Sequence, residues 1–345
     1  MMKKLLIPLM GILVAGCVTN TTLSTGELAK EYLDIWMQKN YPSVTAEASG
    51  IYIISDMTSG AAKWSADKAW VLAEVTIKSL SGTVISTDNK EWSQQLGTYK
   101  VSSYYGGKFS AVGEGASYAG FDAILNGMEI GATRVAIVPA WLLTTSRYSS
   151  EKEYIDNCSA SSSLIYIVHL IAQVTDPTEW EKQQVAAYVS AHYPGATATL
   201  MPGSEEGSEA DGTFWFISDV SGFNEEDKRS ETEMDLSLNY TGYRLDGTVF
   251  DTSVKNTAIQ NEIYNDSRTY EPMKLVYYSK WSDILIDNSS SYVDGFKAGV
   301  SLMWWSGQKA TVIFTSSHGY SSSGNSDAIP AYCPLAFDLE LVPKQ

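Results

Sequence analysis

The hydrophobic positions of this chain predict the same order of elements twice. In each half, an apolar stripe with helical spacing leads to an aromatic-proline pair and then to an apolar run typical of a strand. The first pair is Tyr41-Pro42 with a strand at 51–56, and the second is Tyr193-Pro194 with a strand at 214–219. The apolar residues of the two helices are Leu28, Tyr32, Leu33 and Trp36 in the first half, and Trp180, Tyr188 and Val189 in the second.

Turn glycines repeat in the same order. Gly82 and Gly247 are each followed by Thr-Val, and Gly120-Phe121 is matched later by Gly295-Phe296. The offset between matching positions grows along the chain. The halves are therefore two diverged copies with different loop lengths, not a repeat of fixed period.

Each copy ends in a short amphipathic helix followed by an apolar strand, at 164–174 and 335–342. Strands combined with one short helix are an α+β pattern. We predict two domains, each an antiparallel sheet wrapped around a short helix and each preceded by a helix, over 27–175 and 176–345. The apolar residues of the short helices are Phe121, Ile124, Leu125 and Met128 in the first copy, and Phe296, Val300 and Met303 in the second.

Residues 1–17 look like the signal of a bacterial lipoprotein. Lys3 and Lys4 precede an apolar run over 5–14, and small residues lead from that run to Cys17. The run is too short for a comfortable membrane-spanning helix, which needs about 20 residues. We expect cleavage before Cys17, lipidation of its thiol and a polar tether over 18–26, with the protein anchored in the outer membrane and facing the periplasm.

Composition argues against several classes of function. A net charge of −16 over 345 residues disfavours nucleic acid as a partner, because phosphate binding relies on Lys and Arg. Besides Cys17, only Cys158 and Cys333 are present, too few for a disulfide scaffold or a thiolate metal site. The three histidines are scattered without metal-ligand spacing, and the sequence has no nucleophile elbow or phosphate loop. We therefore expect neither a metal nor a cofactor.

Segment 240–251 reads Tyr-Thr-Gly-Tyr-Arg-Leu-Asp-Gly-Thr-Val-Phe-Asp and is the strongest functional signal. Apolar and polar residues alternate over 236–240, Asp246-Gly247 favours a hairpin turn, and Val249 starts a return strand. The motif resembles the FKBP-type peptidyl-prolyl isomerases. Further segments match that family at Tyr292-Val293-Asp294-Gly295-Phe296, Gly307-Gln308-Lys309-Ala310, Tyr320, Ala328-Ile329-Pro330 and 335–342.

The resemblance implies cis-trans isomerisation of X-Pro bonds in proline-containing polypeptide clients. Such a site is a dry aromatic cleft that binds the twisted amide better than either planar isomer. The family motifs imply catalytic roles for Tyr240, Phe250, Asp251 and Tyr320, and substrate contacts at Tyr292, Val293, Phe296, Ile329 and Phe337. Asp251 would either lie against the substrate carbonyl carbon or orient Tyr240.

The first copy keeps the hairpin and loses these side chains. Matching the two turn glycines places Val75, Ile85 and Ser86 where the second copy has the tyrosine, phenylalanine and aspartate of the motif. We therefore expect the first domain to be a catalytically silent FKBP-like domain. Trp141 and Tyr118 are its candidates for exposed aromatic residues.

Two functions remain open from the sequence. The first is an envelope lipoprotein whose C-terminal domain isomerises X-Pro bonds and assists the folding of exported proteins. The second is a non-catalytic FKBP-like lipoprotein that binds proteins or glycans, because long loops at 253–272 and 277–290 can cover or repurpose a cleft. Phe296 and Phe337 also fit ordinary core positions, and Asp251 fits a turn.

Overall fold

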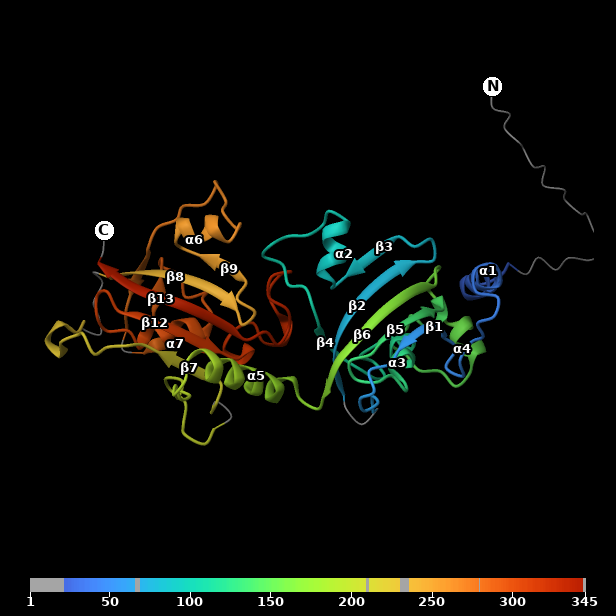
Figure 1. Cartoon of the computed structure of the whole chain (residues 1–345), viewed down its shortest axis with the longest axis horizontal. Coiled ribbons are helices and arrows are strands. Elements are labelled where there is room, and N and C mark those ends of the chain that lie inside the picture. Colours follow the sequence, from blue (N-terminus) through green and yellow to red (C-terminus); the bar gives the residue numbers. More distant parts are fainter. Residues whose placement is uncertain (1–21, 66–68, 209–210, 230–235, 279, 344–345) are drawn as a thin grey trace, which may run out of the picture.

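The computed structural model describes residues 22–65, 69–208, 211–229, 236–278 and 280–343. These residues form two antiparallel sheets at opposite ends of the molecule (Figure 1). The signal, Cys17 and the first part of the tether lie outside the described residues. Within the described ranges, no helix is both long and apolar enough to cross a membrane.

The first sheet has the strand order β1-β5-β6-β2-β3, and β4 pairs with the start of β2. Its strands are β1 (Tyr52–Met57), β2 (Trp70–Ser79), β3 (Val84–Thr87), β4 (Lys108–Ala111), β5 (Thr133–Val138) and β6 (Leu164–Val174). Its helices are α1 (Thr25–Asn40), α2 (Lys90–Gln95), α3 (Ala119–Leu125) and α4 (Glu151–Asp156), with a 3₁₀ turn η1 at Ala140–Leu142.

The second sheet has the order β11-β10-β8-β13-β12-β7, and β9 pairs with β8. Its strands are β7 (Phe214–Ile217), β8 (Leu236–Arg244), β9 (Val249–Thr252), β10 (Met273–Val276), β11 (Leu285–Ile286), β12 (Lys309–Phe314) and β13 (Leu335–Pro343). Its helices are α5 (Pro177–His192), α6 (Lys255–Gln260) and α7 (Asp294–Ser301), with 3₁₀ turns η2 (Glu225–Asp227), η3 (Trp281–Asp283), η4 (Ser316–His318) and η5 (Ser321–Ser323).

The two sheets share one pairing scheme. Strands β7, β8, β9, β10, β12 and β13 pair with one another as β1, β2, β3, β4, β5 and β6 do. In both hairpins two threonine hydroxyls are hydrogen bonded across the strands, Thr76 with Thr87 at 2.6 Å and Thr241 with Thr252 at 2.9 Å. A β-bulge follows in each hairpin. This scheme confirms the predicted α+β class and the duplication.

Glycines let the short helix of each copy lie close to its sheet. A Cβ atom added at Gly295 of α7 would lie 2.4 Å from the Phe314 ring, and one added at Gly120 of α3 would lie 2.2 Å from Val138. Side chains do not tolerate such distances, so both positions require glycine. The close approach fixes the residue that follows Gly295, which is Phe296, against the second sheet.

The prediction for the buried face of α1 was correct for Leu33 and Trp36, which pack in or against the core, and wrong for Leu28 and Tyr32. Leu28 and Tyr32 are 54% and 60% exposed, whereas Ala29, Leu33 and Met37 are buried. The expected and observed stripes overlap at helical spacing, and packing against α4 and η1 selects the observed one.

The expectation for Trp141 was also wrong. Trp141 lies in η1 and is 3% exposed in the core of the first sheet. The Lys30 ammonium of α1 lies 5.4 Å from the centroid of its ring. Tyr118 is exposed, as expected.

Candidate active site in the C-terminal sheet

Four aromatic side chains form a connected cluster between the second sheet and α7. The ring centroid of Phe337 lies 4.9 Å from that of Phe296, 5.7 Å from that of Phe250 and 6.5 Å from that of Tyr240. Phe250 and Phe296 meet Phe337 edge to face, which is the favourable geometry for aromatic pairs. Phe250 is only half-buried, so the cluster is partly exposed to solvent at the Phe250 ring.

Gly242 of β8 leaves room for two of these rings. A Cβ atom at this position would lie 2.7 Å from the Phe337 ring and 2.8 Å from the Phe250 ring. These distances are shorter than van der Waals contact, so any larger residue must displace the rings. The glycine of the Tyr-Thr-Gly motif therefore sets the shape of the cluster.

The polar end of the cluster is a hydrogen-bonded group of three side chains. The Tyr240 hydroxyl donates to Asp251 Oδ2 at 2.6 Å and accepts from Arg268 Nη2 at 2.9 Å. Arg268 Nη1 pairs with Asp251 Oδ1, which also accepts the Thr252 N–H at 2.9 Å. Both carboxylate oxygens are thus occupied, and the arrangement holds the Tyr240 ring in place.

Burial, followed by the nearby Asp251 carboxylate, raises the pKa of Tyr240. The hydroxyl therefore remains protonated and keeps its role as a donor. Burial opposes the charge of Arg268, but the hydrogen bonds and charge interactions with Asp251 and Tyr240 together outweigh burial and raise the pKa of the guanidinium.

Arg268 was not among the predicted residues. It lies 17 residues after Asp251, in the long loop between α6 and β10. A lone arginine in a loop gives no sequence signal for such a pairing, because the loop conformation decides which carboxylate it reaches.

Helix α7 brings three predicted residues to the cluster. The Tyr292 and Phe296 rings stack with centroids 5.7 Å apart and planes 24° apart. Val293 is the N-cap residue of α7. Among the described residues, none accepts a hydrogen bond from the Val293 N–H. This donor is available to a substrate.

The segment before β13 contributes Ile329 and Tyr320. Ile329 is buried in the same core cluster, and Tyr320 is half-buried against it. The Tyr320 hydroxyl has no hydrogen-bond partner in the described part of the chain. Upstream, buried Glu181 of α5 accepts the N–H of Ser316 at 2.6 Å and its hydroxyl at 2.7 Å, which fixes η4 ahead of Tyr320.

The structure therefore gathers the residues that the family motifs predicted for the cleft. Eight of them share one core cluster, and Asp251 joins it through Tyr240. They are Tyr240, Phe250, Asp251, Tyr292, Val293, Phe296, Tyr320, Ile329 and Phe337. Their individual roles remain predictions. No three His, Cys, Asp or Glu side chains of the described ranges gather as a metal site would require.

The first copy differs at the position of Gly242. Ile77 pairs with Ser86 of β3 on one side and with Tyr166 of β6 on the other, as Gly242 pairs with the aspartate and phenylalanine of the second copy. A branched side chain thus stands where the second copy makes room for two rings. The first copy lacks both this space and the polar pair.

A comparison with protein-family models bears directly on this site. Residues 226–342 match the FKBP-type peptidyl-prolyl cis-trans isomerase family. The C-terminal domain is an FKBP-type domain. The match runs from before β8 to the end region of β13, so it contains the whole aromatic cluster and Arg268. It confirms the predicted family and supports prolyl isomerisation by the FKBP-type domain.

Two solved structures are similar to the chain. The three FKBP domains of wheat FKBP73 align with 87% of this chain and 98% of that one, at 15% identity and a TM-score of 0.28. A peptidyl-prolyl cis-trans isomerase from Pseudomonas syringae pv. tomato aligns with 49% of this chain and 96% of its own, at 16% identity and a TM-score of 0.29. TM-scores this low add nothing to the assignment of the FKBP-type domain. No curated protein matches the chain.

Proposed function

We propose that the FKBP-type domain catalyses cis-trans isomerisation of X-Pro bonds in polypeptide clients. The observation that carries this proposal is the aromatic cluster around Phe337, in which the Phe250 ring is only half-buried. Two hydrogen-bond donors nearby, the Val293 N–H and the Tyr320 hydroxyl, have no acceptor among the described residues. The family match over 226–342 supports the same activity.

The chemistry of the reaction suits such a cleft. The amide must rotate through a barrier of about 18–20 kcal/mol, and rotation needs no nucleophile or redox group. As the amide twists it loses resonance, and its carbonyl becomes less polar and less well hydrated. A dry aromatic cleft therefore favours the twisted amide over either planar isomer, which lowers the barrier.

The hydrogen bonds around Asp251 favour one of its two expected roles. Its carboxylate already accepts from Tyr240, Arg268 and Thr252. A carboxylate with these partners is better placed to orient the Tyr240 ring than to approach a substrate carbonyl carbon. We therefore assign Asp251 as a positioning residue, with the Val293 N–H and the Tyr320 hydroxyl as the donors that hold the client backbone.

Phe250→Ala is expected to lower kcat/KM for a short X-Pro peptide by about tenfold or more, since it opens the cleft wall to water. Tyr320→Phe is expected to cost about fivefold, the worth of one hydrogen bond of ~1 kcal/mol. A protease-coupled isomerisation assay on residues 22–345 measures both. Tyr264→Phe is the matched control, because Tyr264 is exposed and stacks on Tyr270 outside the cluster. An inactive wild type, or a double variant with full activity, would favour a non-catalytic role in binding proteins or glycans.

We also propose that the protein is a lipoprotein of the bacterial envelope that assists the folding of exported proteins. The support is the charged start, the apolar run and the small residues that precede Cys17. A lipid at Cys17 would hold the protein at the outer membrane, on the periplasmic face.

Cys17→Ser is expected to move the protein from the membrane fraction to the soluble fraction and to abolish incorporation of labelled fatty acid, because the thiol is the site of lipidation. Fractionation and metabolic labelling of cells that express the full chain measure this. Cys158→Ser is the control, since Cys158 is a free cysteine within the first domain. Membrane association that survives Cys17→Ser would contradict the lipid anchor.

A further inference from the structure

The two domains meet at the segment that carries Ile329. The connection between α2 and β4 of the first domain reaches this segment, and the Tyr104 N–H donates to the Asp327 carbonyl oxygen at 2.7 Å. Lys100 Nζ lies 4.0 Å from the Asp327 carboxylate. The first domain therefore contacts the FKBP-type domain two residues before a predicted substrate contact.

Arg244 joins the same parts of both domains. It lies near the end of β8, is 4% exposed, and donates from Nη1 to the Ala328 carbonyl oxygen at 2.6 Å. The same nitrogen donates to the Ser102 carbonyl oxygen of the first domain at 3.1 Å, and Nη2 donates to that of Ser103 at 3.4 Å. Its Nε pairs with Asp246 at 3.4 Å. One buried guanidinium thus connects the first domain to the residue before Ile329.

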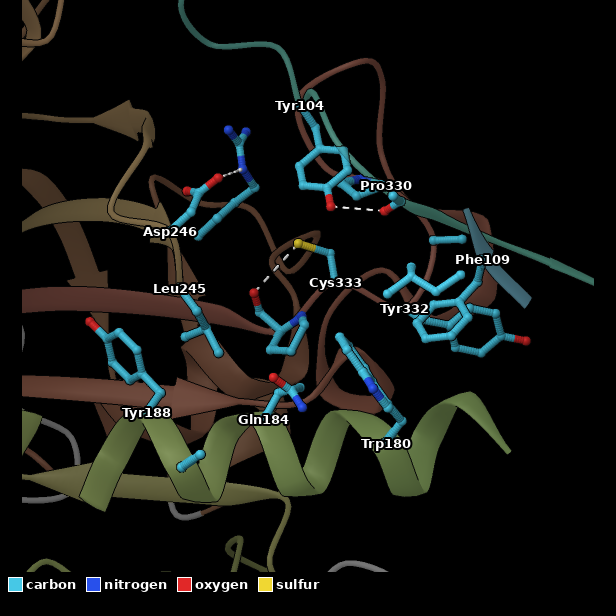
Figure 2. Close-up of a pocket in the computed structure, with 16 residues that line it drawn as sticks. Tyr104, Phe109, Trp180, Gln184, Tyr188, Leu245, Asp246, Pro330, Tyr332 and Cys333 are labelled. Carbon is cyan, nitrogen blue, oxygen red and sulfur yellow. Dashed lines mark hydrogen bonds and ion pairs between the residues drawn. The ribbon is translucent and has the colours of Figure 1, made fainter. Parts of the chain in front are cut away.

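The downstream end of the segment is also held from the first domain. The Tyr332 ring lies edge to face with Trp70 of β2 at 5.3 Å and with Phe109 of β4 at 5.7 Å. Phe109 in turn meets Trp180 of α5 at 5.2 Å. Figure 2 shows Phe109, Tyr332 and Trp180 at one side of an interdomain pocket of about 460 Å³, with Tyr104 and Pro330 above Cys333.

The backbone of this segment needs such support. Ser326 and Tyr332 have φ angles of 57° and 56°, the left-handed region that residues other than glycine adopt at a cost. Such a conformation persists where surrounding contacts determine it. Here those contacts come partly from the first domain, at Asp327 on one side of Ile329 and at Tyr332 on the other, and partly from Arg244, which holds the Ala328 carbonyl.

We propose that the silent first domain and Arg244 together position the Ile329 wall of the active site. Arg244 is a positioning residue, and the first domain serves as a scaffold for substrate binding. This inference rests on the proposed isomerase function. A loosened wall weakens client binding in the ground and transition states alike, so KM is the parameter that should change.

Arg244→Lys tests the role of the guanidinium. Lysine keeps the charge but cannot reproduce a planar fork that spans three carbonyl groups. We expect KM for an X-Pro peptide to rise about fivefold with kcat nearly unchanged, the result of losing one or two hydrogen bonds. Arg147→Lys is the matched control, because Arg147 also donates to several carbonyls and pairs with a carboxylate, but only within the first domain.

Trp70→Ala tests the contribution of the first domain, because it changes no residue of the FKBP-type domain. It should raise KM in the same way, since it removes the ring against Tyr332. Trp36→Ala is its control, because Trp36 packs on Tyr41 and the core of the first sheet, away from this segment. A Trp70→Ala variant that behaves as Trp36→Ala does would overturn the role of the first domain.

Hydrogen exchange of residues 324–333 separates this inference from the proposed function. Faster exchange in Arg244→Lys and Trp70→Ala, but not in the two controls, supports positioning whether or not the wild type is active. Unchanged exchange, or a fall in kcat at constant KM, refutes positioning. An inactive wild type refutes the isomerase proposal alone.

Discussion

Gly242→Ala is expected to lower kcat/KM by about tenfold or more, since each 1.4 kcal/mol of lost transition-state stabilisation costs that factor. The new Cβ atom would lie 2.7 Å from the Phe337 ring and 2.8 Å from the Phe250 ring. Both rings must shift, so the proposed substrate cleft beside them closes or changes shape. Overpacking of this kind also costs about 1–3 kcal/mol of stability. The position is the one at which the first copy carries Ile77.

The measurement is kcat/KM on an X-Pro peptide, corrected for the folded fraction at the assay temperature. Gly222→Ala is the control, because a Cβ atom at Gly222 meets nothing within 4 Å and the backbone there is not left-handed. Wild-type kcat/KM in Gly242→Ala would mean that the rings around Gly242 do not form the reacting cleft.

Phe337→Ala is expected to destabilise the second sheet by about 3–5 kcal/mol, the usual cost of removing a buried phenylalanine. The ring contacts Phe296, Phe250 and Tyr240, and it stacks with Phe314 at 5.8 Å. The substitution leaves a cavity at the centre of the cluster, so kcat/KM of the remaining folded protein should also fall.

Urea unfolding, followed by hydrogen exchange of β8 and β13 amides, measures the stability change. Leu341→Ala separates stability from activity, because Leu341 is fully buried on the same strand and lies opposite Leu238, outside the ring contacts. Leu341→Ala should cost a comparable 2–5 kcal/mol. It should nevertheless keep the activity of the folded fraction. Equal losses of activity in the two variants would mean that Phe337 contributes to the packing of the core and not to the active site.

The local pattern of the sequence predicted the strands and hairpins well. Alternation over 236–240 and the turn glycine Gly247 determine β8 and β9, because strand period and turn chemistry act over a few residues. The same local register brings Tyr240 and Asp251 together. Their contact could therefore be anticipated from the motif.

Contacts that cross long loops or domain boundaries could not be predicted. Arg268 reaches Asp251 only because its loop folds back over the hairpin, and Arg244 meets the first domain through an interface that no sequence period encodes. The buried face of α1 depended likewise on neighbours that are remote in sequence, which buried Ala29 and Met37 beside Leu33 and left Leu28 and Tyr32 exposed.

The place of α5 and β7 determines how this protein can be divided into fragments. Both precede the stretch that matches the family, which begins at residue 226. A fragment cut at that boundary would lose β7, leaving β12 as an open edge ready to pair with other chains. It would also lose Glu181 and leave the Ser316 amide without its acceptor. A fragment that keeps β7 and Glu181 should therefore start no later than Asp176, which caps α5.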